Sequence, residues 1–89
     1  MGSVGVTLPG ALVALFPGSP RRTEVSADTV ADALGVLDAR WPGMRQRLCD
    51  TTPGIRRHIR VFVNGERAAL DTPLPPGAEL FIVTAISGG

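Results

Sequence analysis

Apolar and polar positions alternate near both ends of the 89-residue chain. Residues 4–8 read Val-Gly-Val-Thr-Leu, and residues 79–84 read Glu-Leu-Phe-Ile-Val-Thr. Because successive strand side chains point to opposite faces of a sheet, the first pattern predicts a strand with one buried face. The second predicts a last strand in which Leu80 and Ile82 face one way and Phe81 and Val83 face the other.

Three further strands are predicted between these two. Pro17–Pro20 is a strong turn signal, and Arg21–Ala27 after it returns as the second strand. His58–Val63 alternates again, and the Asn-Gly pair that follows is typical of a tight hairpin. Glu66–Leu70 should therefore be a short edge strand. Ala11–Phe16 either continues the first strand or lines the connecting loop, and the pattern does not decide between these interpretations.

One long helix is predicted in the middle of the chain. Val30, Leu34, Leu37 and Trp41 follow one another at helical spacing and form one apolar stripe. Thr29–Asp32 has the form of a capping box, with Asp in place of the preferred Glu or Gln. The Pro-Gly pair at 42–43 ends the helix, and the next five residues, 44–48, are compatible with a short helical turn.

The predicted order is strand, strand, helix, strand, short strand, strand. One helix on one face of a mixed four- to five-stranded sheet is an α+β two-layer domain. Both terminal strands are apolar, so we expect them side by side in the middle of the sheet, which is the β-grasp (ubiquitin-like) arrangement. We expect residues 1–85 to form this domain and residues 86–89 to form a flexible tail that is disordered beyond about Ala85.

Composition excludes several functional classes. The formal net charge is +1 and there are three Phe, one Trp and no Tyr, which offers little to phosphates or stacked bases, so we expect no nucleic-acid partner. One cysteine allows no internal disulfide and suits a reducing cytoplasm. The start lacks a basic signal-peptide region, and the apolar run at 11–16 is too short to span a bilayer, so we expect no membrane association.

The chain offers no catalytic constellation. It has no phosphate-binding Gly-rich loop ending in Lys-Ser/Thr, because it has no lysine. One His and one Cys cannot form a metal cluster of the usual spacing, so we expect no bound metal or cofactor. Cys49 is better interpreted as a structural residue than as a nucleophile beside His58, which we expect on a solvated strand position. These observations predict a protein that is not itself an enzyme.

The remaining candidate chemistry lies in the tail. Ile86, Ser87, Gly88 and Gly89 follow the last predicted strand with no polar spacer. Glycine lacks a Cβ, so a Gly-Gly backbone can approach another surface closely. An extended four-residue tail reaches roughly 13 Å, at about 3.3 Å per residue. A frayed terminus is the plain alternative. Our hypothesis is that the carboxylate of Gly89 is the functional group and that it is threaded into a narrow site on a partner.

With these features the chain resembles the ubiquitin-like sulfur carriers of the ThiS/MoaD family. The resemblance rests on the strand and helix order, on Thr29–Asp32 opening the helix, and on Gly88-Gly89. Trp41–Leu48 and His58–Glu66, with Val-Phe-Val-Asn-Gly at 61–65, are most similar to the CysO-like branch, which serves cysteine biosynthesis and related pathways.

The resemblance implies a chemical route and a set of partners. An E1-like activating enzyme of the MoeB/ThiF type would use ATP to adenylate Gly89, and a sulfur nucleophile would convert it to a thiocarboxylate. A sulfur-accepting synthase would then take sulfide from the carrier. A metalloprotease that releases product or trims the tail is a further possible partner. The acceptor is left open among a cysteine precursor, thiamine, molybdopterin and a specialised metabolite.

Ubiquitin-like proteins dock on activating enzymes through the open sheet face near the tail. If Leu80 and Ile82 face the helix, then Phe62, Phe81 and Val83 lie on that open face. Arg60 alternates onto the same face, where it would either be solvated or contact an acidic partner surface. We therefore predict these four as docking residues. In the alternative interpretation, the segment 11–16 folds over and covers the apolar ones.

Two other functions share these features. A protein modifier would use the same activated Gly89 carboxylate but join it to amines on other proteins. A non-covalent β-grasp binding module would not activate Gly89 at all. The product that accumulates, a thiocarboxylate or an isopeptide, discriminates between the first two.

Overall fold

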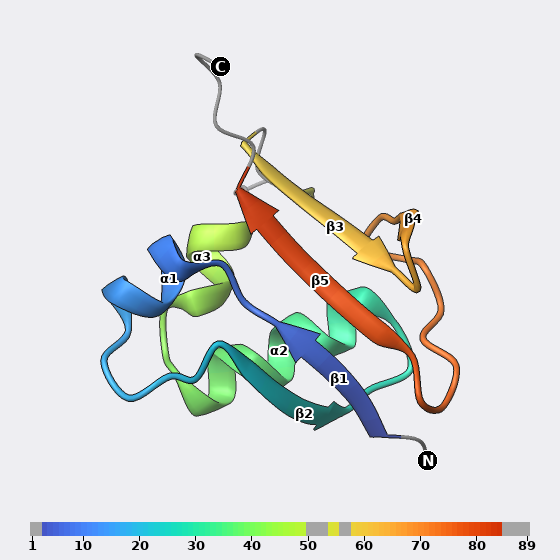
Figure 1. Ribbon diagram of the computed structural model, residues 1–89, viewed down its shortest axis with the longest axis horizontal. Coiled ribbons are helices and arrows are strands. Elements are labelled where there is room, and N and C mark those ends of the chain that lie inside the picture. The colour runs from blue at the N-terminus through green and yellow to red at the C-terminus, as the bar shows by residue number, and fades with distance from the viewer. Residues whose placement is uncertain (1–2, 50–53, 56–57, 85–89) are drawn as a thin grey trace.

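The computed structural model describes residues 3–49, 54–55 and 58–84 of the chain (Figure 1). The strands are β1 (Ser3–Thr7), β2 (Arg22–Ser26), β3 (Ile59–Val63), β4 (Glu66–Arg67) and β5 (Glu79–Thr84). The helices are α1 (Gly10–Leu15), α2 (Val30–Arg40) and α3 (Met44–Leu48). No helix in these described ranges is long and apolar enough to cross a membrane.

The strands form one five-stranded sheet in the order β2-β1-β5-β3-β4. The β1–β5 pair is parallel, and the β1–β2, β3–β5 and β3–β4 pairs are antiparallel. The first and last strands therefore lie side by side, with β5 in the centre of the sheet, as Figure 1 shows. This confirms the predicted mixed sheet and the β-grasp class.

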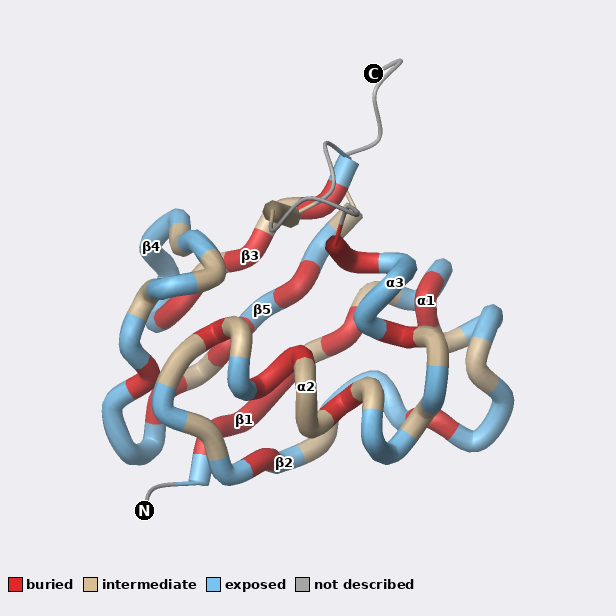
Figure 2. The backbone as a smooth tube through the Cα atoms, turned by 180° about the vertical axis from the view of Figure 1, so that it is seen from behind, coloured by how far each residue is buried: buried red, intermediate tan, exposed pale blue. Residues whose placement is uncertain are grey.

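Helix α2 covers one face of this sheet. In Figure 2, which views the molecule from the opposite side to Figure 1, α2 lies in front of the strands. The helix begins where predicted, because the Thr29 hydroxyl oxygen accepts a hydrogen bond from the Asp32 N–H at 3.2 Å. Val30, Leu34 and Leu37 of the predicted stripe are fully buried. Trp41 is the C-cap residue and is only half-buried, so the stripe is fully buried only from Val30 to Leu37.

The core lies between α2 and the sheet, with contributions from α1 and α3. Its largest fully buried side chains are Leu8, Leu34, Leu37, Met44, Leu48, Leu80, Ile82, Val4, Val6, Val30 and Val61. These residues come from both ends of the sequence and from the central helices, so the sheet and helices form one domain. Burial of this apolar surface is the main source of stability for a domain of this size.

The segment whose conformation the sequence left open is helix α1, which lies in the connection between β1 and β2. It does not extend the first strand, because β1 ends at Thr7. The Pro9 carbonyl accepts hydrogen bonds from the N–H groups of Leu12 and Val13, at 3.0 and 3.1 Å, and this starts the helix. Leu12 is buried, whereas Leu15 is 53% exposed.

The Asn64-Gly65 hairpin is confirmed, but the edge strand after it is shorter than predicted. Asn64 and Gly65 have φ values of 51° and 88°, the left-handed pair that a type I′ turn requires. Strand β4 then ends at Arg67, and the prediction of a strand to Leu70 was wrong. The physical reason is competition for the backbone: the Ala69 N–H donates to a threonine hydroxyl, and the Leu70 carbonyl accepts from α2.

Candidate docking face and carboxyl-terminal tail

Strand β5 positions the candidate site. It is hydrogen-bonded to β1 on one side and β3 on the other, so neither of its edges is open along the paired region. The strand ends at Thr84. Ile86, Ser87, Gly88 and Gly89, together with the predicted disorder beyond Ala85, lie outside the described residues. Their role therefore stays a prediction, and the described geometry concerns the sheet face from which they follow.

The alternation predicted for β5 is confirmed. Leu80 and Ile82 are 0% and 1% exposed and face α2, whereas Phe81 and Val83 are 42% and 38% exposed on the opposite face. With Leu15, they are the large apolar residues that stand exposed in the described part of the chain. A central strand therefore displays two large apolar side chains to solvent within its last four residues.

Strand β3 brings the other two predicted docking residues beside them. Phe62 is paired with Phe81 and Arg60 with Val83 in the antiparallel register, and both β3 residues are half-buried. Directly opposed Cβ atoms in such pairs are about 4.5–5.5 Å apart. The four residues form a continuous cluster, which we call the docking patch. The alternative that segment 11–16 covers the cluster is wrong for Phe81 and Val83, since both are exposed.

The same sheet face carries an ionic cluster at the far end of β5. The Arg22 guanidinium contacts the Glu79 carboxylate at 2.8 Å and that of Glu24 at 3.7 Å. This bridge spans β1 directly over Gly5, where a Cβ would clash with Arg22 Nη2 and lie 2.7 Å from Glu79 Oε2. The cluster was not predicted from the sequence. A glycine inside a strand, which often marks a close approach of other groups, was the available signal.

The remaining candidates from the sequence do not converge on a site. Cys49 is a free, buried thiol at the end of α3, in agreement with a structural role. His58 is exposed as predicted, but it lies in a turn directly before β3 and not on the strand itself. Arg45 and Arg47 lie exposed on α3. Among the residues described, no group of three His, Cys, Asp or Glu side chains is placed to hold a metal ion.

A β-grasp sheet that displays apolar residues beside the start of a Gly-Gly tail defines the class of ubiquitin-like carriers. Comparison with known proteins places the chain within that class. The sequence pattern of the ThiS family matches residues 6–89. Because the match covers nearly the whole chain, the protein belongs to the ThiS family.

Individual relatives agree with this assignment. The chain is 38% identical over 69 residues to small archaeal modifier protein 1 of Haloferax volcanii, covering 76% of this chain and 79% of that protein. It is 28% identical over 93 residues to the sulfur carrier protein CysO of Mycobacterium tuberculosis, covering 98% and 99% of the two chains. A chain in the crystal structure of the Amycolatopsis orientalis BexX/CysO complex matches with a TM-score of 0.86 at 28% identity, covering 97% and 99%.

ThiS-family carriers are substrates of activating enzymes and are not themselves enzymes. The relatives include both a sulfur carrier and a small modifier. Membership of the family therefore identifies this protein as a sulfur carrier or a small modifier. The predicted family and the prediction of a non-enzyme are thereby confirmed.

Proposed function

We propose that this protein is a sulfur carrier whose Gly89 carboxylate is activated by an ATP-dependent, E1-like enzyme. The carboxylate oxygen attacks the α-phosphorus of ATP, which expels pyrophosphate and leaves an acyl-adenylate. A sulfide-level nucleophile then attacks the acyl carbon and displaces AMP, which leaves a thiocarboxylate at Gly89. The thiocarboxylate sulfur then displaces a leaving group from an electrophilic carbon of the acceptor and forms a thioester. Water hydrolyses the acyl C–S bond of this thioester, which restores the Gly89 carboxylate and leaves the sulfur on the acceptor as a thiol.

The observation that carries this proposal is the position of the exposed pair Phe81 and Val83. Both lie in the last four residues of β5, directly before the tail. An exposed apolar cluster on a small domain is typical of an interaction site. An enzyme that buries this cluster would hold the central strand, and the tail would enter its active site from a fixed starting point. A fixed origin favours the reaction because positioning errors of about 1 Å can cost ~10²-fold in rate.

Within this proposal, the domain comprises residues 1–85 and the tail residues 86–89, and the docking patch contacts the activating enzyme. A sulfur-accepting synthase would contact the carrier in the next step. The CysO relatives match over almost the full chain, and a CysO has been crystallised with BexX, which favours a synthase as one partner. A cysteine-biosynthetic acceptor is the first candidate, because the segments most similar to the CysO-like branch, Trp41–Leu48 and His58–Glu66, include strand β3 of the docking patch.

The experiment that tests this function uses the full chain with its cognate activating enzyme. Pyrophosphate exchange that depends on the carrier reports adenylation, and intact mass reports replacement of one oxygen by sulfur at Gly89. We expect both signals with the natural chain. Absence of carrier-dependent exchange would remove the proposal, because no later step can proceed without the adenylate.

A second candidate function is protein modification. The 38% identity to small archaeal modifier protein 1 favours it. The same adenylate would then react with an amine of another protein and form an isopeptide bond. The chain has no lysine, so it cannot form lysine-linked chains of itself. Mass spectrometry of tryptic digests from the native host distinguishes the two outcomes by a branched peptide or a thiocarboxylate.

A further inference from the structure

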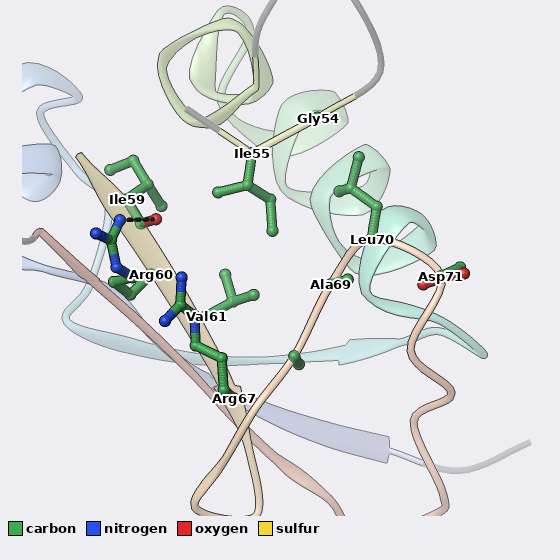
Figure 3. Close-up of a pocket in the computed structure, with 10 residues that line it drawn as sticks. Gly54, Ile55, Ile59, Arg60, Val61, Arg67, Ala69, Leu70 and Asp71 are labelled. Carbon is green, nitrogen blue, oxygen red and sulfur yellow. Dashed lines mark hydrogen bonds between the residues drawn. The ribbon is translucent and has the colours of Figure 1, made fainter. Parts of the chain in front are cut away.

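Strands β2 and β4 are the outer strands of the sheet. The backbone edge of an outer strand can pair with a strand of another molecule, and proteins protect such edges in several ways. Strand β4 is protected by its length, since it comprises only Glu66 and Arg67. Figure 3, which looks into the groove beside β3, shows the chain running from Arg67 past Leu70 and away from that strand. Strand β2 spans five residues, Arg22–Ser26, so its edge is the longer of the two.

The register of β2 with β1 identifies the backbone groups on the outer edge of β2. The Leu8 N–H donates to the Arg21 carbonyl at 2.7 Å, so this pair is hydrogen-bonded between the strands. Because hydrogen-bonded and non-hydrogen-bonded pairs alternate along an antiparallel ladder, the Gly5–Glu24 pair is a non-hydrogen-bonded one. The Gly5 N–H agrees with this, since it donates to the Ala78 carbonyl at 3.0 Å, on the side of β5. The N–H and C=O of Glu24 therefore point outward, away from β1.

Arg40, the last residue of α2, occupies this outer edge. Its Nη1 donates to the Glu24 carbonyl at 2.8 Å and to the Thr23 hydroxyl at 3.0 Å. Glu24 is the middle residue of β2, so the guanidinium lies where an added strand would have to donate. Arg40 is exposed, and the contact is therefore not a consequence of filling the core.

The rest of this edge is limited at both ends. Pro20, just before the strand, has no N–H to offer to a neighbouring strand. Beyond Ser26 the chain is already paired: the Leu74 N–H donates to the Asp28 carbonyl at 2.7 Å, and residue 29 forms an antiparallel bridge with residue 73. Another chain could therefore pair only with Arg22–Ser26, and Arg40 lies at the centre of that segment.

We propose that Arg40 protects the outer edge of β2 from a second copy of this chain. Without the guanidinium, two copies of β2 fit side by side in an antiparallel, two-fold symmetric register. With Thr23 opposite Thr23 of the second copy, Arg22 of each copy lies opposite Glu24 of the other. Both residues point outward, so each pair exchanges backbone hydrogen bonds. The opposite charges of the two side chains stabilise this register, because directly opposed residues on paired strands interact.

This inference goes beyond the proposed function, because it involves neither the tail nor the docking patch. Strand β1 lies between β2 and β5, and Arg40 reaches β2 from the helix side of the sheet. Protection of this edge keeps the carrier monomeric, so that each molecule presents one docking patch and one tail to a partner.

Sedimentation equilibrium of the full chain tests the proposal. Arg40→Met keeps an unbranched side chain and removes every donor, so we expect its dimer to form at a concentration at least about tenfold lower than that of the natural chain. Arg40→Lys retains the positive charge and a donor, and it should stay close to the natural chain. Arg45→Met, which removes an exposed arginine of α3, is the matched control for loss of one charge and should also stay close to it.

Two further variants test the mechanism. Thr23→Val keeps the shape of the side chain and removes one of the two acceptors that hold Arg40, so it should promote the dimer in the same direction but less strongly. Glu24→Pro, added to Arg40→Met, removes an outward N–H and should restore the monomer, since proline is tolerated on an outer strand where its nitrogen faces solvent. In ¹⁵N-labelled Arg40→Met, the amide signals of Arg22 and Glu24 should shift with protein concentration, whereas those of Phe81 and Val83 should not.

All these variants should be adenylated and thiolated like the natural chain at concentrations where they are monomeric. Failure of this proposal is therefore distinguishable from failure of the proposed function.

Several results would overturn the proposal. A folded Arg40→Met that stays monomeric over the same range as the natural chain removes it, as does equal dimerisation of Arg45→Met. Concentration-dependent shifts at Phe81 and Val83 would assign the association to the docking patch instead. A dimer that survives Glu24→Pro would exclude strand pairing. If Arg40→Met does not fold, Thr23→Val decides the question, and unchanged association of that variant counts against protection by Arg40.

Discussion

The two faces of β5 differ in what they contact, although their residues alternate along one strand. Leu80 and Ile82 are buried beneath α2, whereas Phe81 and Val83 are exposed on the opposite face. The helix-facing residues belong to the core and therefore contribute mainly to stability. The open-face residues bury less surface, and they are available to a partner. The difference indicates that stability and recognition can be changed separately in this protein.

The largest loss of stability is expected from truncating the helix side of this core. Leu37 is fully buried on α2. Leu37→Ala should lower the free energy of unfolding by ~2–5 kcal/mol, because it removes buried methyl groups and leaves a cavity. Urea denaturation measures the change. The fraction that remains folded should still be adenylated normally, and a loss of adenylation per folded molecule would contradict the separation of the two faces.

A smaller loss is expected from the start of α2. The Thr29 hydroxyl accepts the Asp32 N–H at 3.2 Å, and Thr29→Ala removes that acceptor. The cost should be about 1 kcal/mol, typical of a lost N-cap. Thermal unfolding gives the change, and Thr29→Ser serves as the control because serine retains the hydroxyl. If alanine and serine destabilise equally, the hydrogen bond is not the stabilising feature.

A substitution on the open face should affect docking more than folding stability. Phe81→Ala should cost less than about 1 kcal/mol of folding stability, because the side chain is 42% exposed and on the far side of the sheet from α2. It should nonetheless raise the carrier concentration needed for half-maximal pyrophosphate exchange by about tenfold or more. Leu15→Ala is the matched control, since Leu15 is an exposed apolar residue on α1. Equal effects of both substitutions on exchange would show that docking is not specific to the patch.

Much of the architecture was predictable because local signals and the global fold agree. Alternation assigned the faces of β3 and β5, and helical spacing assigned the buried side of α2. The Asn-Gly turn fixed the position of the β3–β4 hairpin. Since the register of a strand decides which residues are exposed, the same alternation was enough to place Phe81 and Val83 on the open face.

The features that the sequence did not predict depend on competition between distant groups. Helix α1 is short, and no side chain of its own caps its N-terminus, so periodicity over six residues could not identify it. The early end of β4 requires hydrogen bonds to Thr72 and α2 that no local pattern reveals. The bridge from Arg22 to Glu79 joins residues 57 apart, and only the sheet order brings them together.

The smallest change in stability, and the largest in function, is expected at the tail. Deletion of Gly89, or addition of one residue after it, leaves both faces of the sheet untouched, since β5 ends at Thr84. The free energy of unfolding should change by less than ~0.5 kcal/mol, the usual range for peripheral substitutions.

Thiocarboxylate formation should nonetheless fall by ~10²-fold or more in both tail variants, because one residue moves the carboxylate by roughly 3.3 Å and displacements of about 1 Å can already cost that factor. Pyrophosphate exchange and intact mass measure the loss. Ser87→Ala, which keeps the length of the tail, is the matched control and should be activated at close to the natural rate. If the extended chain is activated and thiolated like the natural one, without prior trimming, Gly89 is not the reacting residue. The two faces of the sheet would still differ in stability and recognition, but the docking patch would bind a partner that does not activate the tail.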